Sequence, residues 1–407
     1  MLLLVSAGAE PLSLNEAVEI ALEQSLAVDE SRVQKALGVQ SVAEGVEGFF
    51  PRITTSTSAS DSTFAELGSG MWGTDIRLTQ PVLDATTIFG LLAGIQQAGI
   101  SKAQSIQTIA RLIKDVQNAY YDLAKSQALL LSAERQHERT LENSKVTTRR
   151  FELKDVSNAE MLRAEANLLK AEQDIITAET NLENNQRILS DLLGFEEIKE
   201  FKAEALPDAE EPYSLSSTVI SAELLERNPD FDVLLRQAKS TDLTYWGTWA
   251  SILPSLNLTA SRSWTQDEWI PSDWDTGANS IGLTVSFPIA DVTGKALSLN
   301  RARLNRKQSR ISLARQELAF RQTLAGLLAT QESSYKGWEV AEKNVELSNE
   351  VYRLTMRSYE LGASSQADLL EVAAELMLAE RALVEAQAAY WSSRAELNYF
   401  LGSSLED

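Results

Sequence analysis

The pattern of apolar and polar residues is dominated by a seven-residue period. Near the end of the chain, large apolar residues recur every seven positions, each followed three positions later by a mostly small residue. The large series is Leu369, Leu376, Leu383, Tyr390 and Leu397, and an earlier stretch repeats it as Met161, Leu168, Ile175, Leu182 and Leu189. Such series are typical of helices packed along their length, and small residues in the second series let those helices approach closely.

Two very long stretches contain no proline within helix-forming sequence. They run from Pro81 to about Lys154 and from Pro288 to about Leu361. Roughly seventy residues of helix would span on the order of 100 Å at 1.5 Å per residue. Globular helices average only about 11 residues. On the helices alone, a soluble antiparallel coiled-coil rod fits as well as any other interpretation.

The chain contains one arrangement of motifs twice. A constant offset aligns Phe151-Glu152-Leu153 with Tyr359-Glu360-Leu361, and Leu193-Gly194 with Leu401-Gly402. We therefore expect two structural repeats, residues 11–206 and 207–407, after a signal-peptide remnant at 1–10. In the first repeat we expect helices at about 12–48, 82–153 and 157–193, and strands at about 53–60 and 71–80. In the second repeat we expect helices at about 215–250, 289–361 and 365–401, and strands at about 255–264 and 280–287.

The four predicted strands show a loose alternation of apolar and polar residues. Each is rich in Thr, Ser and Gly, which is a weak signature of strands in an outer-membrane barrel. Six of the eight tryptophans lie in or beside them, as in an aromatic girdle: Trp72, Trp246, Trp249, Trp264, Trp269 and Trp274. Four strands cannot close a membrane barrel, because bacterial barrels begin at about eight. The barrel would therefore be shared between chains; a small soluble sheet capping a helical bundle is the alternative.

Composition narrows the function classes. The chain has 37 Lys and Arg against 58 Asp and Glu, a net charge of −21, which would repel nucleic acid. It has no cysteine and one histidine, His137, so multi-histidine metal sites and Ser-His-Asp catalysis are nearly excluded. We expect no enzyme activity, no cofactor and no metal. No run approaches the ~18 apolar residues of a membrane-spanning helix, and the first nine residues are similar to the end of a secretory signal.

Several motifs, taken with the duplication, carry a family resemblance. They are Leu14-Asn15-Glu16-Ala17, Phe50-Pro51-Arg52-Ile53, Leu78-Thr79-Gln80-Pro81-Val82, and Ser358-Tyr359-Glu360-Leu361-Gly362 followed by Asp368-Leu369-Leu370. The chain resembles the TolC-like outer-membrane factors of Gram-negative efflux and type I secretion systems. The resemblance implies a mainly helical chain with a small membrane β-barrel: a homotrimer with four strands per chain in the barrel and a helical barrel across the periplasm. It also implies a periplasmic adaptor and an inner-membrane transporter as partners, with outer-membrane lipid around the barrel.

The resemblance further implies a pore gate at two periplasmic turns. These turns hold Lys154, Asp155 and Ser157 in the first repeat and Gly362, Ser364 and Ser365 in the second. Asp368 and Glu371 match the acidic pore ring, and Glu160 and Tyr359 match neighbouring tip positions. Asp368 and Glu371 lie three residues apart, so they share one face of a helix.

Alternatives remain open for the gate and for the function. Asp368 can instead be an acid that caps a helix N-terminus, and the two roles can coexist. The turns also differ from each other, with Arg163 in the first repeat where the second has Glu371. The expected function is a passive exit duct gated at its periplasmic tip; the alternative is a soluble or surface coiled-coil scaffold without transport activity.

Overall fold

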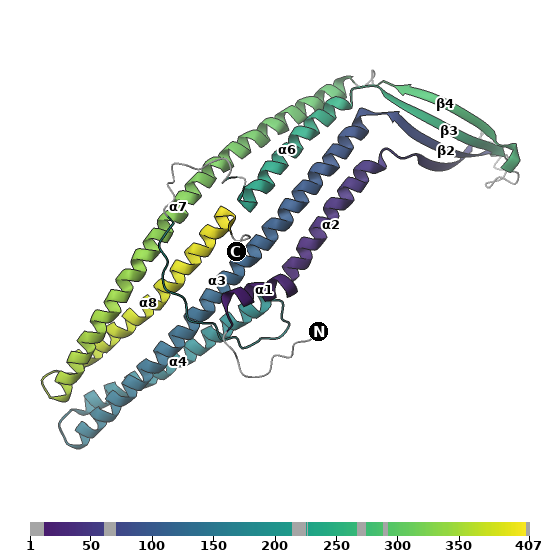
Figure 1. Cartoon of the computed structure of the whole chain (residues 1–407). Helices are drawn as coiled ribbons and strands as arrows, with labels where there is room; N and C mark the ends of the chain where they lie inside the picture. The colour runs from purple at the N-terminus through teal and green to yellow at the C-terminus, as the bar shows by residue number, and fades with distance from the viewer. Residues whose placement is uncertain are drawn as a thin grey trace. The chain divides into compact units, whose positions relative to one another are not determined.

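The computed structural model describes residues 12–60, 71–213, 225, 227–266, 274–287 and 292–403. The expected signal remnant at 1–10 lies outside them. The chain divides into two compact units. Unit 1 comprises residues 1–31, 106–229 and 318–407, and unit 2 comprises residues 32–105 and 230–317. Figure 1 labels the helices and strands of both units.

Unit 2 contains a four-stranded antiparallel sheet in the order β1-β2-β3-β4. The strands are β1 (Arg52–Ser60), β2 (Met71–Leu83), β3 (Ser255–Gln266) and β4 (Ala278–Ser286), and a short 3-10 helix, η1 (Trp274–Thr276), precedes β4. Among the described residues, β1 and β4 each pair on one side only, so both are edge strands. The predicted fold class, mainly helical with four strands, is confirmed.

The register of the sheet separates apolar from polar side chains. Residues directly opposite each other in a sheet share a face. Ile53 faces Leu78, which faces Ala260, which faces Ile281. The same face also carries Ile76, Leu256, Leu258, Leu283 and Val285, whereas the other face carries Arg52, Arg77, Asp75, Thr259, Ser261, Ser280 and Thr284. The sheet therefore has one mainly apolar face and one polar face.

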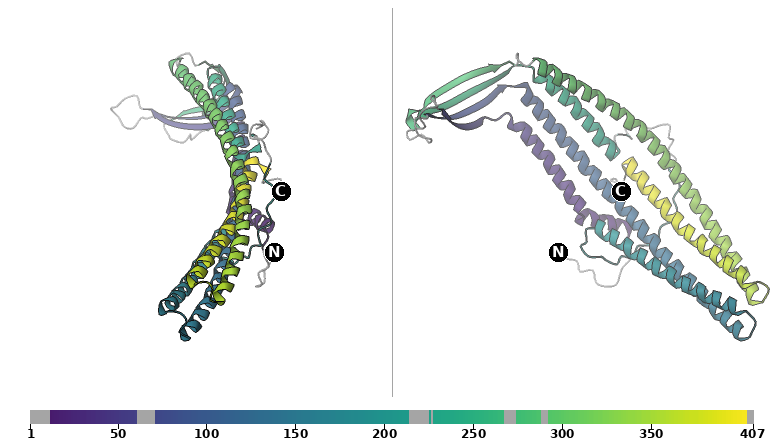
Figure 2. Two further views of the ribbon diagram at one scale, coloured as in Figure 1. Left: turned by 90° about the vertical axis from the view of Figure 1, so that its left-hand side faces the viewer. Right: turned by 180° about the vertical axis from the view of Figure 1, so that it is seen from behind.

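The helical part of unit 2 consists of segments of α2 (Leu26–Glu47), α3 (Ala85–Glu152) and α7 (Val292–Glu360), together with α6 (Pro229–Ala250). Figures 1 and 2 show these segments side by side in the order α2, α3, α6, α7. Glycines bring α2 and α3 together: a Cβ on Gly94 would lie 2.3 Å from the Ser41 carbonyl oxygen, and one on Gly45 would lie 2.8 Å from the Leu91 Cα. Across the next boundary, the Gln96 side chain of α3 donates to the Arg236 carbonyl of α6 at 3.0 Å.

Unit 1 contains α1 (Leu14–Gln24), α4 (Asn158–Leu192), α8 (Gln366–Leu401) and the remaining parts of α3 and α7. Its core is built around aromatic residues, namely Tyr120, Tyr121, Trp338, Tyr390 and Trp391. Burial raises the pKa of Tyr121 to about 12. The segment after α4 is tied to this core, because the Trp391 indole donates to the Pro207 carbonyl at 3.2 Å and Tyr390 donates to that of Glu210.

Two expected helices differ from the structure. The helix expected at about 12–48 is broken at Ser25, whose extended backbone ends α1 and whose hydroxyl accepts from the Ala27 amide in the first turn of α2. Gly194 packs against this break, since a Cβ there would lie 2.5 Å from the Gln24 carbonyl oxygen. The helix expected at about 215–250 is described as α6 only from Pro229, and residues 214–224 lie outside the described part.

Candidate functional site

The two predicted tip turns have the same backbone conformation. Lys154 and Gly362 both adopt a left-handed conformation, with φ of 62° and 76°. In the first turn the Asp155 amide donates to the Arg150 carbonyl at 2.9 Å, and in the second the Ala363 amide donates to the Ser358 carbonyl at 2.8 Å. This is the Schellman pattern that ends a helix. Lys154 is the only described non-glycine residue with a positive φ, so the first turn carries backbone strain that Gly362 avoids in the second.

Both turns lead into helices capped in the same way. The Ser157 and Ser365 hydroxyls accept from the amides of Glu160 and Asp368, whose carboxylates accept in return from the serine amides at 2.7 and 3.0 Å. These are capping boxes at the N-termini of α4 and α8. The pKa of Asp368 is lowered mainly by the hydrogen bond from the Ser365 backbone amide. The hydrogen bonds from the Ser365 and Ser364 side chains lower it further. Asp368 therefore caps the N-terminus of α8, which was one of its two predicted roles, and Glu160 caps the N-terminus of α4 in the same way.

A second set of contacts joins the two hairpins within unit 1. Figures 1 and 2 show the α3–α4 and α7–α8 turns side by side at one end of the unit. The Arg150 guanidinium lies 5.0 Å from the centre of the Tyr359 ring and donates to the Asp155 carboxylate at 2.9 Å. The Asp155 hydrogen bond raises the pKa of Arg150. Tyr359 is 2% exposed, so it packs between the hairpins.

A buried amide adds a second link nearby. The Gln366 side chain, from the first turn of α8, donates to the Thr147 hydroxyl of α3 at 3.2 Å, and both residues are buried. Farther along the helices, Arg139 of α3 forms a salt bridge with Glu380 of α8 at 2.6 Å. Half-buried pairs of this kind fix one hairpin against the other, because separating them would leave partly desolvated groups unpaired.

The predicted gate residues thus fall into two groups. Glu160 and Asp368 belong to capping boxes and Tyr359 contacts the other hairpin, whereas Glu371 lies exposed on α8 outside the capping box. Sequence reasoning missed Arg150, Thr147 and Gln366. Arg150 lies in the last turn of α3, five residues before Asp155, so a charge pair across the predicted turn was the available signal.

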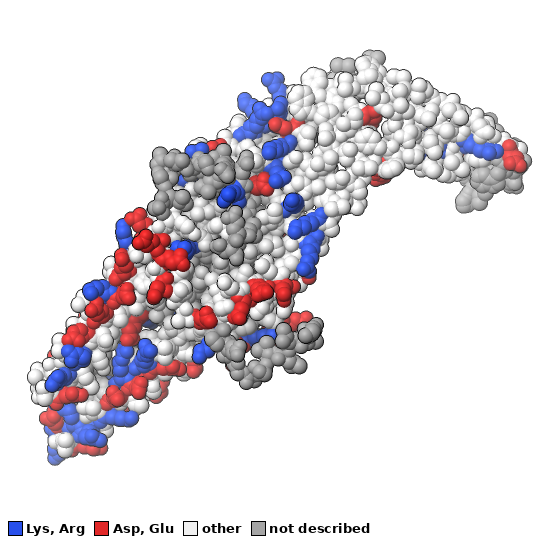
Figure 3. All heavy atoms as spheres, viewed as in Figure 1, with Lys and Arg blue, Asp and Glu red and all other residues white. Residues whose placement is uncertain are grey.

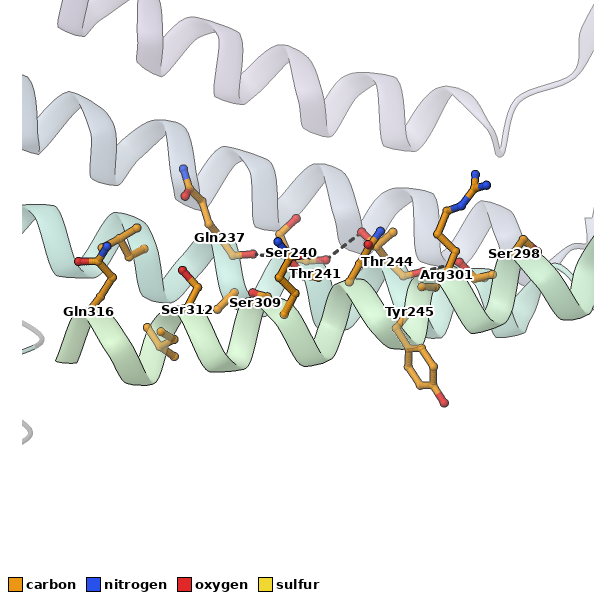
Figure 4. Close-up of a pocket in the computed structure, with 17 residues that line it drawn as sticks. Gln237, Ser240, Thr241, Thr244, Tyr245, Ser298, Arg301, Ser309, Ser312 and Gln316 are labelled. Carbon is orange, nitrogen blue, oxygen red and sulfur yellow. Dashed lines mark hydrogen bonds between the residues drawn. The ribbon is translucent and has the colours of Figure 1, made fainter. Parts of the chain in front are cut away.

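A polar hollow lies between α6 and α7 in unit 2 (Figure 4). Its volume is about 670 Å³. Hydroxyl and amide side chains line most of it, including Gln237, Ser240, Thr241, Thr244, Asn305, Gln308, Ser309 and Ser312, and Arg301 is its charged residue. Figure 4 shows the Tyr245 ring pointing to the opposite side of the two helices from Arg301.

No helix in the described part of the chain is both long and apolar enough to cross a bilayer. The sheet is the element with a broad apolar face. On β4, the side chains of Ile281, Leu283 and Val285 are 82%, 63% and 67% exposed. Their neighbours in the strand, Gly282 and Thr284, belong to the polar face. Alternation of this kind is expected of strands with lipid on one side and water on the other.

Comparison with known proteins identifies the class that this fold and these hairpins define. The family model "Outer membrane efflux protein" matches residues 17–195 and 220–403. The chain therefore belongs to the outer membrane efflux protein family, and the predicted resemblance to TolC-like outer-membrane factors is confirmed. Its homologues are efflux channels of the Gram-negative outer membrane that extend into the periplasm, so the predicted localisation and class are confirmed as well.

Individual relatives are distant in sequence and close in fold. The chain is 21% identical over 352 residues to "Outer membrane protein TolC" of Salmonella enteritidis, covering 83% of this chain and 70% of that protein. It is 23% identical over 329 residues to "Probable efflux pump outer membrane protein TtgC" of Pseudomonas putida, covering 77% and 66%. Among solved structures, the Campylobacter jejuni CmeC outer membrane channel matches with a TM-score of 0.83 at 16% identity, covering 96% of this chain and 86% of that one. The chain thus spans about two thirds of the length of the curated relatives it matches.

Proposed function

We propose that this chain is the exit duct of a tripartite efflux or type I secretion system, a passive conduit across the outer membrane and periplasm. The observation that carries the proposal is the sheet, which in the described part of the chain has one mainly apolar face, one polar face and an edge strand on each side. A sheet in lipid must satisfy its edge amides and carbonyls, because no water is present there to do so. Four strands per chain then require other copies to close the barrel.

A homotrimer satisfies both edges. β4 of one copy would pair with β1 of the next, which gives a closed barrel with the apolar face toward lipid and the polar face toward the lumen. The same arrangement would place α7 of one copy beside α2 of the next, since α2 leads into β1 and α7 follows β4. The internal duplication supports this, because each half supplies two strands flanked by long helices.

The gate is proposed at the two hairpin turns. Glu160, Asp368 and Glu371 of each copy would surround one narrow opening, and crowded carboxylates favour cations over anions. Arg150, Asp155 and Tyr359 hold the hairpins together, so opening would require this contact to yield. The tip residues Lys154, Asp155, Ser157, Gly362, Ser364 and Ser365 would meet the periplasmic adaptor and the inner-membrane transporter. The duct itself would have no catalytic role, no cofactor and no affinity for nucleic acid.

Planar-bilayer recording of the purified protein tests the proposal. We expect a cation-selective conductance that multivalent cations block, and we expect the Asp368→Ala/Glu371→Ala variant to show weaker selectivity and weaker block while still forming trimers. Ser365→Ala is the matched control, because it weakens the α8 cap without removing charge. Unchanged selectivity and block in the double variant would place the constriction elsewhere.

Membrane fractionation separates the duct from the scaffold. A barrel protein is expected in the outer membrane and, after detergent extraction, at the mass of three copies. A protein that stays soluble, or a monodisperse monomer that keeps its strands in detergent, would contradict the shared barrel. The family and structural matches favour the channel, and no comparison favours a scaffold.

A further inference from the structure

The first part of α7 is strongly basic in an otherwise acidic chain. Residues 292–316 include seven Lys or Arg and no Asp or Glu, whereas the whole chain has a net charge of −21. The seven are Lys295, Arg301, Arg303, Arg306, Lys307, Arg310 and Arg315. Figure 3 shows Lys and Arg gathered over this part of α7, next to a band with few charged residues that leads to the strands. Neither the duct nor the acidic gate uses this concentration of positive charge.

Four of these residues form a single surface, which we call the basic face. Arg303, Arg306, Lys307 and Arg310 line a shallow hollow of about 410 Å³ together with Ile311 and Ala314. Arg303 and Lys307 are exposed and have no ion-pair partner among the described residues. An unneutralised pair of cations at the rim of a hollow is suited to hold an anion.

Asp242 of α6 anchors the other half of the basic face. Its carboxylate accepts from Arg306 at 2.7 Å and from Arg310 at 3.3 Å. Burial alone would raise the pKa of Asp242, but the hydrogen bonds from Arg306 and Arg310 outweigh burial and lower it. One carboxylate against four cations leaves a net positive face. The Arg306 guanidinium also lies 4.9 Å from the Tyr245 ring centre and 5.9 Å from that of Trp246.

The aromatic neighbours place the basic face near the sheet. Trp246 and Trp249 are 49% and 44% exposed in the last turns of α6, which ends at Ala250 just before β3. Exposed tryptophan beside a membrane barrel is typical of the lipid–water interface. Asp242 lies eight residues before the end of α6, which is about 12 Å along the helix. The headgroup layer is roughly 6 Å thick, and charges in salt solution interact over a Debye length of about 10 Å. The two lengths together exceed the roughly 12 Å between Asp242 and the end of α6, so the basic face can interact electrostatically with lipid phosphates.

We propose that the basic face binds the headgroup of an anionic phospholipid in the periplasmic leaflet of the outer membrane. The inference rests on the proposed function, because it requires the sheet to lie in that membrane. Arg303 and Lys307 would contact the phosphate, Arg306 and Arg310 would be held in place by Asp242, and Trp246 and Trp249 would lie at the level of the glycerol backbone. Long Arg and Lys side chains can extend toward headgroups while their stems stay on the helix.

Lipid competition in vesicles tests the proposal. The full chain is reconstituted in phosphatidylcholine containing brominated phosphatidylglycerol, and tryptophan quenching is compared with that by brominated phosphatidylcholine. We expect the wild type to prefer phosphatidylglycerol, and Arg303→Gln/Lys307→Gln to lose roughly 25-fold of that preference, because each basic residue near a membrane surface is worth about fivefold. Raising the salt concentration should weaken the wild-type preference.

The matched control is Arg301→Gln/Arg315→Gln, which removes the same charge from α7 outside the basic face. Arg301 lines the polar hollow, on the side opposite the Tyr245 ring (Figure 4). The control should keep the wild-type preference. Equal losses in both variants would show a diffuse effect of helix charge and would overturn the proposal. Loss of the trimer in the Arg303/Lys307 variant would assign the face to a contact between copies and would overturn it as well.

Conductance distinguishes this inference from the proposed function. A wild-type protein that inserts and conducts but shows no preference for phosphatidylglycerol contradicts the lipid site alone. A protein that neither inserts nor conducts contradicts the duct, and with it the premise of the lipid site.

Discussion

Gly94 should be one of the least replaceable small residues of unit 2, because it sets the approach of α2 and α3. An added Cβ would lie 2.3 Å from the Ser41 carbonyl oxygen and 3.1 Å from the Ser41 carbonyl carbon. Ordinary van der Waals contact begins near 3.4 Å. Because the obstructing atoms are backbone, no side-chain rotation can relieve the clash. Gly94→Ala therefore forces the two helices apart by about 1 Å, a gap that forfeits much of the dispersion energy between them.

The expected magnitude follows from two opposing effects. Overpacking of this kind costs about 1–3 kcal/mol, whereas replacing a helical glycine by alanine gains about 1 kcal/mol of helix propensity. Gly90 is the matched control, since it lies one turn earlier on α3 and its added Cβ would meet nothing within 4 Å. Both variants gain the same propensity, so the difference between their stabilities isolates the clash at about 1–3 kcal/mol.

Urea unfolding in detergent, at a fixed protomer concentration, measures this difference. We expect Gly90→Ala to be more stable than the wild type and Gly94→Ala to be less stable than Gly90→Ala. If the two alanine variants unfolded at the same urea concentration with the same slope, the close approach of α2 and α3 through Gly94 would be refuted.

Three further predictions concern the hairpins of unit 1. Lys154→Gly should stabilise the protein by about 1 kcal/mol in thermal unfolding by removing a left-handed non-glycine residue, and Gly362→Ala should destabilise it by a similar amount, since open space around Gly362 leaves the backbone as the only cost. The pKa of Asp368 in the folded state lies below its ordinary value of 3.8, so the folded state binds fewer protons than the unfolded state. The stability that the charged Asp368 contributes should therefore be lost as pH falls below about 4, and Asp368→Asn should lack that part of the pH dependence of unfolding. Ala379→Phe should cost about 1–3 kcal/mol of unfolding free energy, because Ala379 is 2% exposed, whereas Glu385→Ala, at an exposed position, should cost little.

The regular elements were the most predictable part of the fold. The seven-residue period lies within α4 and α8, and their first turns were marked by Ser157 and Ser365 with an acid three positions later. The break at Ser25 was not predicted, because a lone serine interrupts neither the apolar pattern nor helix propensity. β2 continues through Pro81 to Leu83, beyond the end predicted at about residue 80, and the register shifts between Pro81, which has no amide hydrogen to donate, and Leu83.

The contacts between the hairpins were less predictable than the turns themselves. A heptad shows which face of a helix is buried, but it does not say which other helix covers it. The stacking of Arg150 on Tyr359 and the bond from Gln366 to Thr147 join positions about two hundred residues apart, and each depends on how two hairpins lie beside each other. The anchor of the basic face was not predictable for the same reason, since the contact of Arg306 with Asp242 requires α6 and α7 to be adjacent.

The capping boxes decide which carboxylates remain available to a gate. Asp368 and Glu160 each accept from a serine amide at the start of a helix, so part of their charge is already balanced by the backbone dipole there. Glu371 lies one turn deeper in α8, is exposed, and is not part of the capping box. In the proposed trimer it would therefore present the least compensated charge to the lumen. The first repeat has Arg163 at the position that matches Glu371 and contributes Glu160 alone to the proposed gate, so a cation there would be held mainly by the second repeat of each copy.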